Sequence, residues 1–260
     1  MKKIKISFTG FPGWHIECSA MSMKYLGEHF DLHTGGEDHV PIHHTNEIAQ
    51  SEGATGKKFV NYWLHVAFLT DKSGEKISKS KGGLFTLSEL EAQGYKPEHY
   101  RYFCLQTHYK KPLIFTLENL DASKNAFERI ARKIIELKAH PTKGKPPASS
   151  YETEFLEAIN DDLNTPKAIQ VLLKLLDEED IDSKAKLELL NKFDEALGLN
   201  LSNLKEEKTQ IPEEVKALAD AREKERKAKN WAESDILRNR IKELGFNLED
   251  SPTGPKLTKI

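Results

Sequence analysis

Residues 30–51 read FDLHTGGEDHVPIHHTNEIAQS, and this stretch decides the fold class. Phe30–His33 has the composition of a short strand, and the two glycines that follow it, Gly35 and Gly36, predict a sharp turn. The residue spacing over 42–51 then fits a helix. A strand that leads into a helix is the repeating unit of a parallel α/β layer, which is the fold class we expect for this part of the chain.

The neighbouring segments agree with such a layer. Residues 4–8 alternate apolar and polar side chains and predict a strand, whereas residues 16–25 fit a helix. Residues 59–69 are apolar, and their pattern fits a strand as well as a helix. The first 86 residues therefore predict an α/β unit.

After residue 86 the pattern changes to helices. Helices are predicted over residues 87–93, 97–107, 117–139, 151–160, 165–176 and 183–197, and a helical hairpin over 212–229 and 230–244. Residues 140–150 and 200–210 predict linkers, and Phe246 and Leu248 are expected to extend away from the hairpin. This half of the chain therefore predicts a helical bundle and a small C-terminal module.

Composition restricts the class of protein. Of the 260 residues, 38% are hydrophobic and 31% are charged, and no run approaches the ~20 apolar residues needed to cross a bilayer. We therefore expect no membrane partner and a cytoplasmic location. The two cysteines, Cys18 and Cys104, provide no disulfide framework. A net charge of −2 excludes a uniformly basic nucleic-acid binder, but it leaves room for local basic patches.

Cys18, His43 and Glu47 are the candidate metal ligands. His43 and Glu47 are four residues apart, so on a helix they project from the same face, and a thiolate from another segment can complete a mixed sulfur, nitrogen and oxygen site for zinc. Each residue also has an ordinary interpretation. A His-x-x-x-Glu pair is usually an exposed helix face, and a lone cysteine is usually a buried apolar side chain.

Two glycine-rich or lysine-rich segments are candidates for nucleotide binding. Gly35 and Gly36 let the backbone approach a ligand closely, and the Asp38 carboxylate can accept from ribose hydroxyls, although the same residues fit a simple turn. Lys76 and Lys79 belong to the run KISKS, whose ammonium and hydroxyl groups suit a triphosphate but also suit a solvated surface loop.

Four blocks in this order resemble the cysteinyl-tRNA synthetases, a family of class I aminoacyl-tRNA synthetases. The blocks are GWHIECS at 13–19, HTGGED at 33–38, HHTNE at 43–47 and KISKS at 76–80. The resemblance implies that Cys18, His43 and Glu47 bind zinc. It also implies that Trp14, His15 and His33 serve the cysteine substrate.

For the reaction, the resemblance implies the ATP-dependent attachment of cysteine to its tRNA through cysteinyl-adenylate, with ATP used together with Mg. Lys79 matches the lysine that binds the ATP phosphates, Lys76 lies beside it in the catalytic loop, and Gly35, Gly36 and Asp38 match an adenylate-binding segment. The expected fold is the second half of a Rossmann-like class I synthetase catalytic domain followed by an α-helical tRNA-binding bundle. The expected parts are a catalytic half-domain at 1–86, stem-contact helices at 87–140, an anticodon-stem bundle at 151–199 and a tRNA-binding module at 211–260.

The sequence departs from the family pattern at its start. It reaches Gly13 almost at once, without the family's N-terminal cysteine ligand and His-x-Gly-His motif. We therefore expect a chain that is inactive alone, either a gene fragment or a natural truncation, with a missing N-terminal half as a further partner. Two alternatives stay open: a non-catalytic tRNA- or zinc-binding paralogue, and a ligase that joins cysteine to an amino-sugar in thiol biosynthesis. The long helical tail favours tRNA over the amino-sugar.

Overall fold

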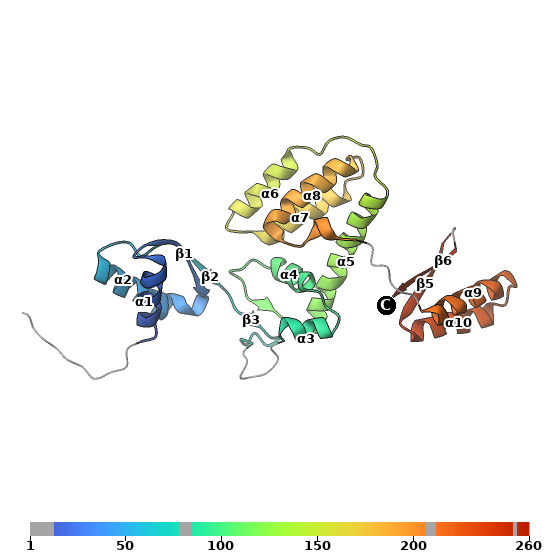
Figure 1. Ribbon diagram of the computed structural model, residues 1–260, viewed down its shortest axis with the longest axis horizontal. Helices are drawn as coiled ribbons and strands as arrows, with labels where there is room; N and C mark the ends of the chain where they lie inside the picture. The colour runs from blue at the N-terminus through green and yellow to red at the C-terminus, as the bar shows by residue number, and fades with distance from the viewer. Residues whose placement is uncertain (1–12, 78–84, 206–211, 252–253, 260) are drawn as a thin grey trace, which may run out of the picture. The chain divides into compact units, whose positions relative to one another are not determined.

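The computed structural model describes residues 13–77, 85–205, 212–251 and 254–259, and the chain divides into two compact units, Met1–Leu204 and Lys205–Ile260 (Figure 1). The strand predicted at 4–8 lies outside the described residues. No helix within the described part of the chain is both long enough and apolar enough to cross a membrane.

The first described elements of the first unit are a helix followed by a β-α-β arrangement. These elements are α1 (His15–Leu26), β1 (Phe30–Gly36), α2 (Thr45–Thr55) and β2 (Val60–Val66). Strands β1 and β2 run parallel, with Phe30 opposite Val60 and Gly36 opposite Val66. The expected parallel α/β layer is therefore confirmed, and most of the ambiguous segment 59–69 is a strand. The helix predicted at 16–25 begins slightly earlier, at His15.

Gly35 and Gly36 do not form the predicted turn. They are the last two residues of β1 and lie opposite His65 and Val66 of β2. A Cβ atom on Gly35 would lie 2.5 Å from Cε1 of His44, so glycine is needed there to let an imidazole ring pack on the strand end. The chain changes direction only afterwards, through the 3₁₀ turn η1 (Glu37–His39) and the π-helical turn η2 (Val40–His44) that leads into α2.

A second cluster of elements follows within the same unit. It contains β3 (Leu69–Thr70), α3 (Leu87–Ala92), α4 (Pro97–Leu105), β4 (Leu113–Ile114) and α5 (Leu117–Ala139). Strands β3 and β4 pair in parallel, and Leu90, Phe103, Phe115 and Leu120 form the small core between them and the helices. The bounds of α5 agree with the amphipathic pattern read from the sequence.

The helical bundle consists of α6 (Ser150–Asn160), α7 (Thr165–Asp177) and α8 (Ser183–Leu197), packed with the far half of α5. The rings of Phe155 and Phe193 stack in its centre with centroids 4.0 Å apart. The predicted linker at 200–210 is wrong at its start, because the short 3₁₀ helix η4 (Leu201–Asn203) places Leu201 fully inside the core. Burial of this apolar residue helps to anchor a stretch that is otherwise polar.

The second unit contains α9 (Glu213–Lys227), α10 (Trp231–Glu243) and an antiparallel hairpin, β5 (Phe246–Ser251) with β6 (Gly254–Lys259). The sequence predicted that Phe246 and Leu248 extend away from the helices, and this prediction is wrong. They are buried with Val215 and Ile241, because alternate residues of β5 face the helices.

Candidate metal and nucleotide site

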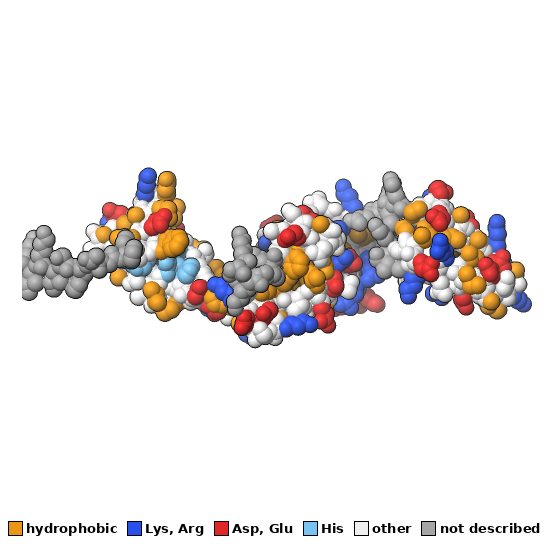
Figure 2. Space-filling model, turned by 90° about the horizontal axis from the view of Figure 1, so that it is seen from below, with side chains coloured by type: hydrophobic (Ala, Val, Ile, Leu, Met, Phe, Trp, Pro, Cys, Tyr) orange, Lys and Arg blue, Asp and Glu red, His pale blue; other side chains and the backbone are white. Residues whose placement is uncertain are grey.

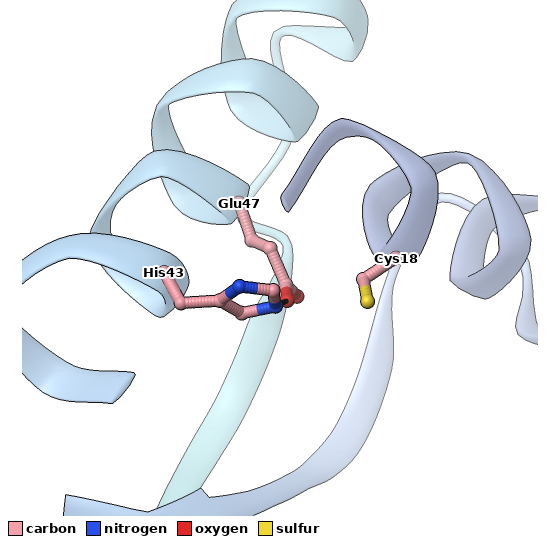
Figure 3. A group of neighbouring side chains, drawn as sticks. All are labelled: Cys18, His43 and Glu47. Atoms are coloured by element: carbon pink, nitrogen blue, oxygen red, sulfur yellow. Dashed lines mark ion pairs between the residues drawn. The ribbon is translucent and has the colours of Figure 1, made fainter. Parts of the chain in front are cut away.

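The three candidate metal ligands come from three different elements of the first unit. Cys18 lies on α1, His43 on the π-helical turn η2, and Glu47 on the first turn of α2. Their sulfur, nitrogen and oxygen ligand atoms all lie within 4.8 Å of one another (Figure 3). Cys18 and His43 are half-buried and Glu47 is fully buried. The structure thus brings together residues that are up to 29 positions apart in the sequence (18 to 47).

The Glu47 carboxylate shows how well these residues suit a cation. Its Oε1 atom lies 2.7 Å from Nε2 of His43, yet within the described part of the chain this buried oxygen has no hydrogen-bond partner with acceptable geometry. Two such atoms can lie close together without a hydrogen bond when the lone pairs of Oε1 and of Nε2 point to the same position. Two ligands of one metal ion have this arrangement. The other oxygen, Oε2, accepts a hydrogen bond of 2.8 Å from Nε2 of His33. The residues present therefore fit a divalent cation.

The surroundings of the Cys18 thiol are partly buried and negatively charged, and they would favour a nearby cation. Burial, and then the nearby carboxylates of Glu47 and Glu17, raise the pKa of this thiol above its usual value. The thiol on its own therefore keeps its proton at neutral pH. A bound divalent cation would favour the thiolate and reverse this direction, because coordination requires the deprotonated form.

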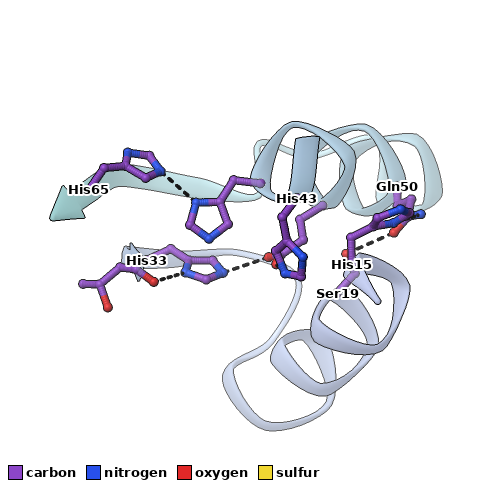
Figure 4. Close-up of polar contacts among 9 residues, drawn as sticks. His15, Ser19, His33, His43, Gln50 and His65 are labelled. Carbon is purple, nitrogen blue, oxygen red and sulfur yellow. Dashed lines mark hydrogen bonds and ion pairs between the residues drawn. The ribbon is translucent and has the colours of Figure 1, made fainter. Parts of the chain in front are cut away.

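A group of stacked rings surrounds the carboxylate from the side of the sheet. His33 stacks on Trp63 with centroids 4.7 Å apart, and Nδ1 of His44 shares a hydrogen bond of 2.8 Å with Nε2 of His65 (Figure 4). Burial, followed by repulsion from the neighbouring histidines, lowers the pKa of His44 to about 4, so this imidazole is neutral at pH 7. In the space-filling view the imidazoles gather at one place on the surface (Figure 2).

Trp63 and His65 are members of this group that sequence reasoning did not identify. They lie on β2 and reach the histidines of the neighbouring segment only because the parallel register places His33 opposite Trp63. The alternation of large rings at 63 and 65 was the available signal, but it does not show which strand lies beside them.

Trp14 and His15, expected near the substrate, differ in their surroundings. Trp14 precedes α1 and is 78% exposed. The His15 ring lies 6.3 Å from the His43 ring and its Nδ1 atom accepts a hydrogen bond of 2.7 Å from Nε2 of Gln50. His15 therefore borders the ligand group, whereas Trp14 is largely exposed among the described residues.

The candidate nucleotide residues meet at the carboxyl end of the sheet. Asp38 lies on η1, two residues after Gly36, which is the last residue of β1. Nζ of Lys76 lies 3.5 Å from Oδ2 of Asp38 and 3.9 Å from the centre of the Phe68 ring. Lys79 lies outside the described residues. The structure thus joins two predicted motifs at the edge where parallel α/β sheets commonly bind ligands.

One face of the two-stranded sheet is apolar, and the described residues leave much of it uncovered. Leu32 and its partner across the strands, Tyr62, are 54% and 71% exposed. Leu64 and Val66 follow Tyr62 at two-residue spacing on the same face, and they line one side of a pocket of about 380 Å³. The opposite face carries His33, which contacts α2 through Glu47.

Three family descriptions match successive parts of the chain. "tRNA synthetases class I (C) catalytic domain" matches residues 7–125, "DALR domain" matches residues 154–202, and "Cysteinyl-tRNA ligase anticodon binding domain" matches residues 208–254. Most of each matched range lies within the described residues.

Curated relatives match nearly the whole chain. Cysteine–tRNA ligase 1 of Burkholderia lata is 42% identical over 248 residues, which are 95% of this chain and 52% of that protein. The cysteine–tRNA ligases of Treponema denticola and Methylococcus capsulatus are 40% and 42% identical and cover 93% and 94% of this chain, which spans 55% and 56% of them. The chain therefore spans about half the length of these relatives.

A solved structure has a similar fold. The LeuRS of Agrobacterium radiobacter K84, in ternary complex with tRNA and LeuAMS, superimposes with a TM-score of 0.52 at 15% identity, over 66% of this chain and 26% of that chain. At that identity the likeness concerns the fold alone.

Proposed function

This chain belongs to the cysteinyl-tRNA synthetase family, and from that premise we propose that it serves the ATP-dependent attachment of cysteine to its tRNA through cysteinyl-adenylate. The observation that carries the proposal is the convergence of Cys18, His43 and Glu47, with a buried carboxylate oxygen that lacks a hydrogen-bond partner among the described residues. The proposal assigns selection of cysteine to these residues.

We assign zinc to this group of ligands. Three protein ligands leave one coordination position free for a substrate thiol. When bound, zinc would favour a soft thiolate over a serine hydroxyl, a distinction that pocket shape alone makes poorly. His33 would hold Glu47 in place through its hydrogen bond to Oε2, and His15, beside His43, would border the substrate together with Trp14.

We assign ATP, with its Mg, to the carboxyl end of the sheet. Gly35 and Gly36 would allow close approach of the adenosine, and Asp38 would accept from the ribose hydroxyls. Lys76 and Lys79 would neutralise the charge that develops on the leaving pyrophosphate. The ion pair between Lys76 and Asp38 supports this assignment, because the lysine proposed for the phosphates lies beside the carboxylate proposed for the ribose.

The uncovered sheet face supports a further partner. Parallel sheets are normally covered on both faces, whereas β1 and β2 expose Leu32, Tyr62 and Val66. We propose that polypeptide from outside the described residues, equivalent to the other half of a class I catalytic domain, covers this face and completes the site. Activation of cysteine would require that addition.

The helical parts favour tRNA as the acceptor. We propose the division into a catalytic half-domain (1–86), stem-contact helices (87–140), an anticodon-stem bundle (151–199) and a tRNA-binding module (211–260), acting in the cytoplasm. The match of residues 208–254 to an anticodon-binding domain supports tRNA over the amino-sugar alternative. A non-catalytic role in binding tRNA or zinc is the second candidate, and the uncovered sheet face is the observation that favours it.

Zinc titration with matched cysteine variants tests the proposal. We expect one zinc ion per chain for the wild type and for Cys104→Ser, because Cys104 lies in the apolar pocket between α4 and β4. We expect Cys18→Ser to lose affinity by roughly 10-fold or more, since a hydroxyl is a poor zinc ligand. Equal zinc binding by Cys18→Ser and the wild type would overturn the metal assignment.

A further inference from the structure

Cys18 and Glu47 stand on different helices, so their convergence depends on how α1 is held against α2. The two helices pack together, and three polar side chains connect them near the ligands: His15 and Ser19 on α1, and Gln50 on α2. His15 precedes Cys18 by three residues and Ser19 follows it directly, while Gln50 follows Glu47 by three residues. The contact therefore lies about one helical turn after Glu47 on α2, and its two residues on α1 stand before and after Cys18.

Gln50 uses both ends of its amide in this contact. Its Nε2 atom donates to Nδ1 of His15 at 2.7 Å, and its Oε1 atom accepts from the Ser19 hydroxyl at 3.5 Å (Figure 4). Ser19 is only 2% exposed, so its hydroxyl has little access to water as a substitute partner. One side chain thus spans two successive turns of the helix that carries Cys18.

The direction of these hydrogen bonds gives the glutamine a specific role. An amide nitrogen only donates, so Nδ1 of a neutral His15 must be the acceptor and its proton must sit on Nε2. The His15 ring is also packed against Gly13, where an added Cβ would lie 1.9 Å from Nε2. The ring thus lies close to Gly13 on its own segment and is hydrogen-bonded to Gln50 on α2.

We propose that Gln50 is a positioning residue, which fixes α1 in register with α2 so that the Cys18 sulfur stays within reach of His43 and Glu47. This inference rests on the metal site proposed above. Removal of partners that orient metal ligands typically lowers metal affinity by about 10–100-fold. We expect a loss of that size from Gln50→Leu, which keeps a similar volume and removes both hydrogen bonds.

Zinc competition against a chelator and Co²⁺ absorption test the proposal. We expect Gln50→Leu to bind zinc about 10–100-fold more weakly and to weaken the thiolate-to-cobalt charge-transfer band, which reports the Cys18 bond directly. We expect Gln50→Glu to fall in between, because a carboxylate still accepts from Ser19 but cannot donate to His15. Gln93→Leu, at an exposed glutamine after α3, serves as the matched control and should bind as the wild type does.

A second measurement needs no metal. In a Cys104→Ser background, the rate at which a disulfide reagent modifies Cys18 reports how firmly α1 is held. We expect Gln50→Leu to increase this rate several-fold and Gln93→Leu to leave it unchanged. Failure of the wild type to bind zinc would contradict the proposed function, whereas wild-type rates and zinc affinity in a folded Gln50→Leu protein would overturn the role of Gln50. Should Gln50→Leu not fold, Gln50→Glu and Ser19→Ala decide the question with the same readouts.

Discussion

Glu47 is a fully buried carboxylate that faces two histidines, one at each oxygen. An isolated buried charge costs several kcal/mol, so such a residue persists only where partners compensate it. His33 provides a hydrogen bond to one oxygen, and the other oxygen has no hydrogen-bond partner among the described residues. The Glu47 side chain thus contacts both His33, in the group of stacked rings, and His43, the neighbouring candidate ligand.

Gly35 provides a test of the packing around this group. We expect Gly35→Ala to lower the free energy of unfolding by roughly 1–3 kcal/mol, because its Cβ would lie 2.5 Å from the buried His44 ring and 2.9 Å from His39. Gly53→Ala on α2 is the matched control. Nothing lies within 4 Å of its added methyl group, so we expect this change to stabilise the helix by up to ~1 kcal/mol. Urea denaturation of both variants gives the two signs, and a stabilising Gly35→Ala would contradict the close packing.

Lys79 tests the phosphate assignment. In the assembled enzyme we expect Lys79→Ala to slow cysteine activation, because the loss of the ammonium group raises the activation free energy by roughly 2–4 kcal/mol. Cysteine binding should stay almost unchanged. Lys72→Ala, which removes an exposed lysine that pairs with Glu118, should change neither quantity. The measurement is ATP–pyrophosphate exchange at varied cysteine concentration. Loss of cysteine affinity with an intact activation rate would place Lys79 outside the phosphate site.

At the scale of the elements, polar side chains close in sequence form hydrogen bonds with the backbone at the ends of helices. Thr86 accepts from the backbone of Glu89 at the start of α3, and the Glu89 carboxylate accepts in return from the Thr86 backbone. Asp194 near the end of α8 accepts from the backbone N–H groups of Leu199 and Leu201, which holds η4 in the core of the bundle. The local rules of helix N-termini explain the start of α3, and the Asp194 contacts join residues only five and seven positions apart.

The capping box at α3 predicts a pH dependence. Hydrogen bonds from the backbone and then the side chain of Thr86 lower the pKa of Glu89 below its usual value of 4.5. The stabilisation is therefore fully present above the unfolded-state pKa and is lost as the pH falls through the lower folded-state pKa. We expect the α3 amides to lose hydrogen-exchange protection over that acidic range. Glu89→Gln should remove the pH dependence, and Glu91→Gln, on the same helix, should retain it.

At the scale of the whole molecule, the two units have separate cores. The core of residues 205–260 contains Ile241, which is fully buried, whereas Ile236 on the same helix is exposed. We expect Ile241→Ala to destabilise this unit by about 2–5 kcal/mol and Ile236→Ala to have little effect, as measured by hydrogen exchange of α9 and α10. Zinc affinity should remain unchanged in both. A change of zinc affinity in Ile241→Ala would show that the units are coupled.

The assembly of the active site gives the last prediction. We expect the 260-residue chain alone to show no appreciable cysteine-dependent ATP–pyrophosphate exchange, because the described residues leave one face of its sheet exposed at Leu32 and Tyr62. Addition of the N-terminal half of a relative should restore part of the activity, and Tyr62→Lys on the uncovered face should prevent that restoration. Robust exchange by the chain alone would show that the site needs no further polypeptide.

Some of this protein follows from the sequence by itself, because the interactions concerned are local. The bounds of α5 and α8, the pairing of His43 with Glu47 one turn apart, and the family to which the four motifs point all depend on residues close together in the chain. Periodicity and spacing are sufficient for such features.

Other features were decided by the tertiary structure, because they join segments whose neighbours no local pattern identifies. The parallel register of β1 and β2 stacks His33 on Trp63. The ion pair of Asp38 with Lys76 joins residues that are 38 positions apart. Gln50 on α2 forms a hydrogen bond with His15 on α1. The same packing turned Gly35 from an expected turn residue into a strand residue beside an imidazole ring. A helix face or a strand alternation shows which side chains point inward, but only the packed chain determines what they meet there.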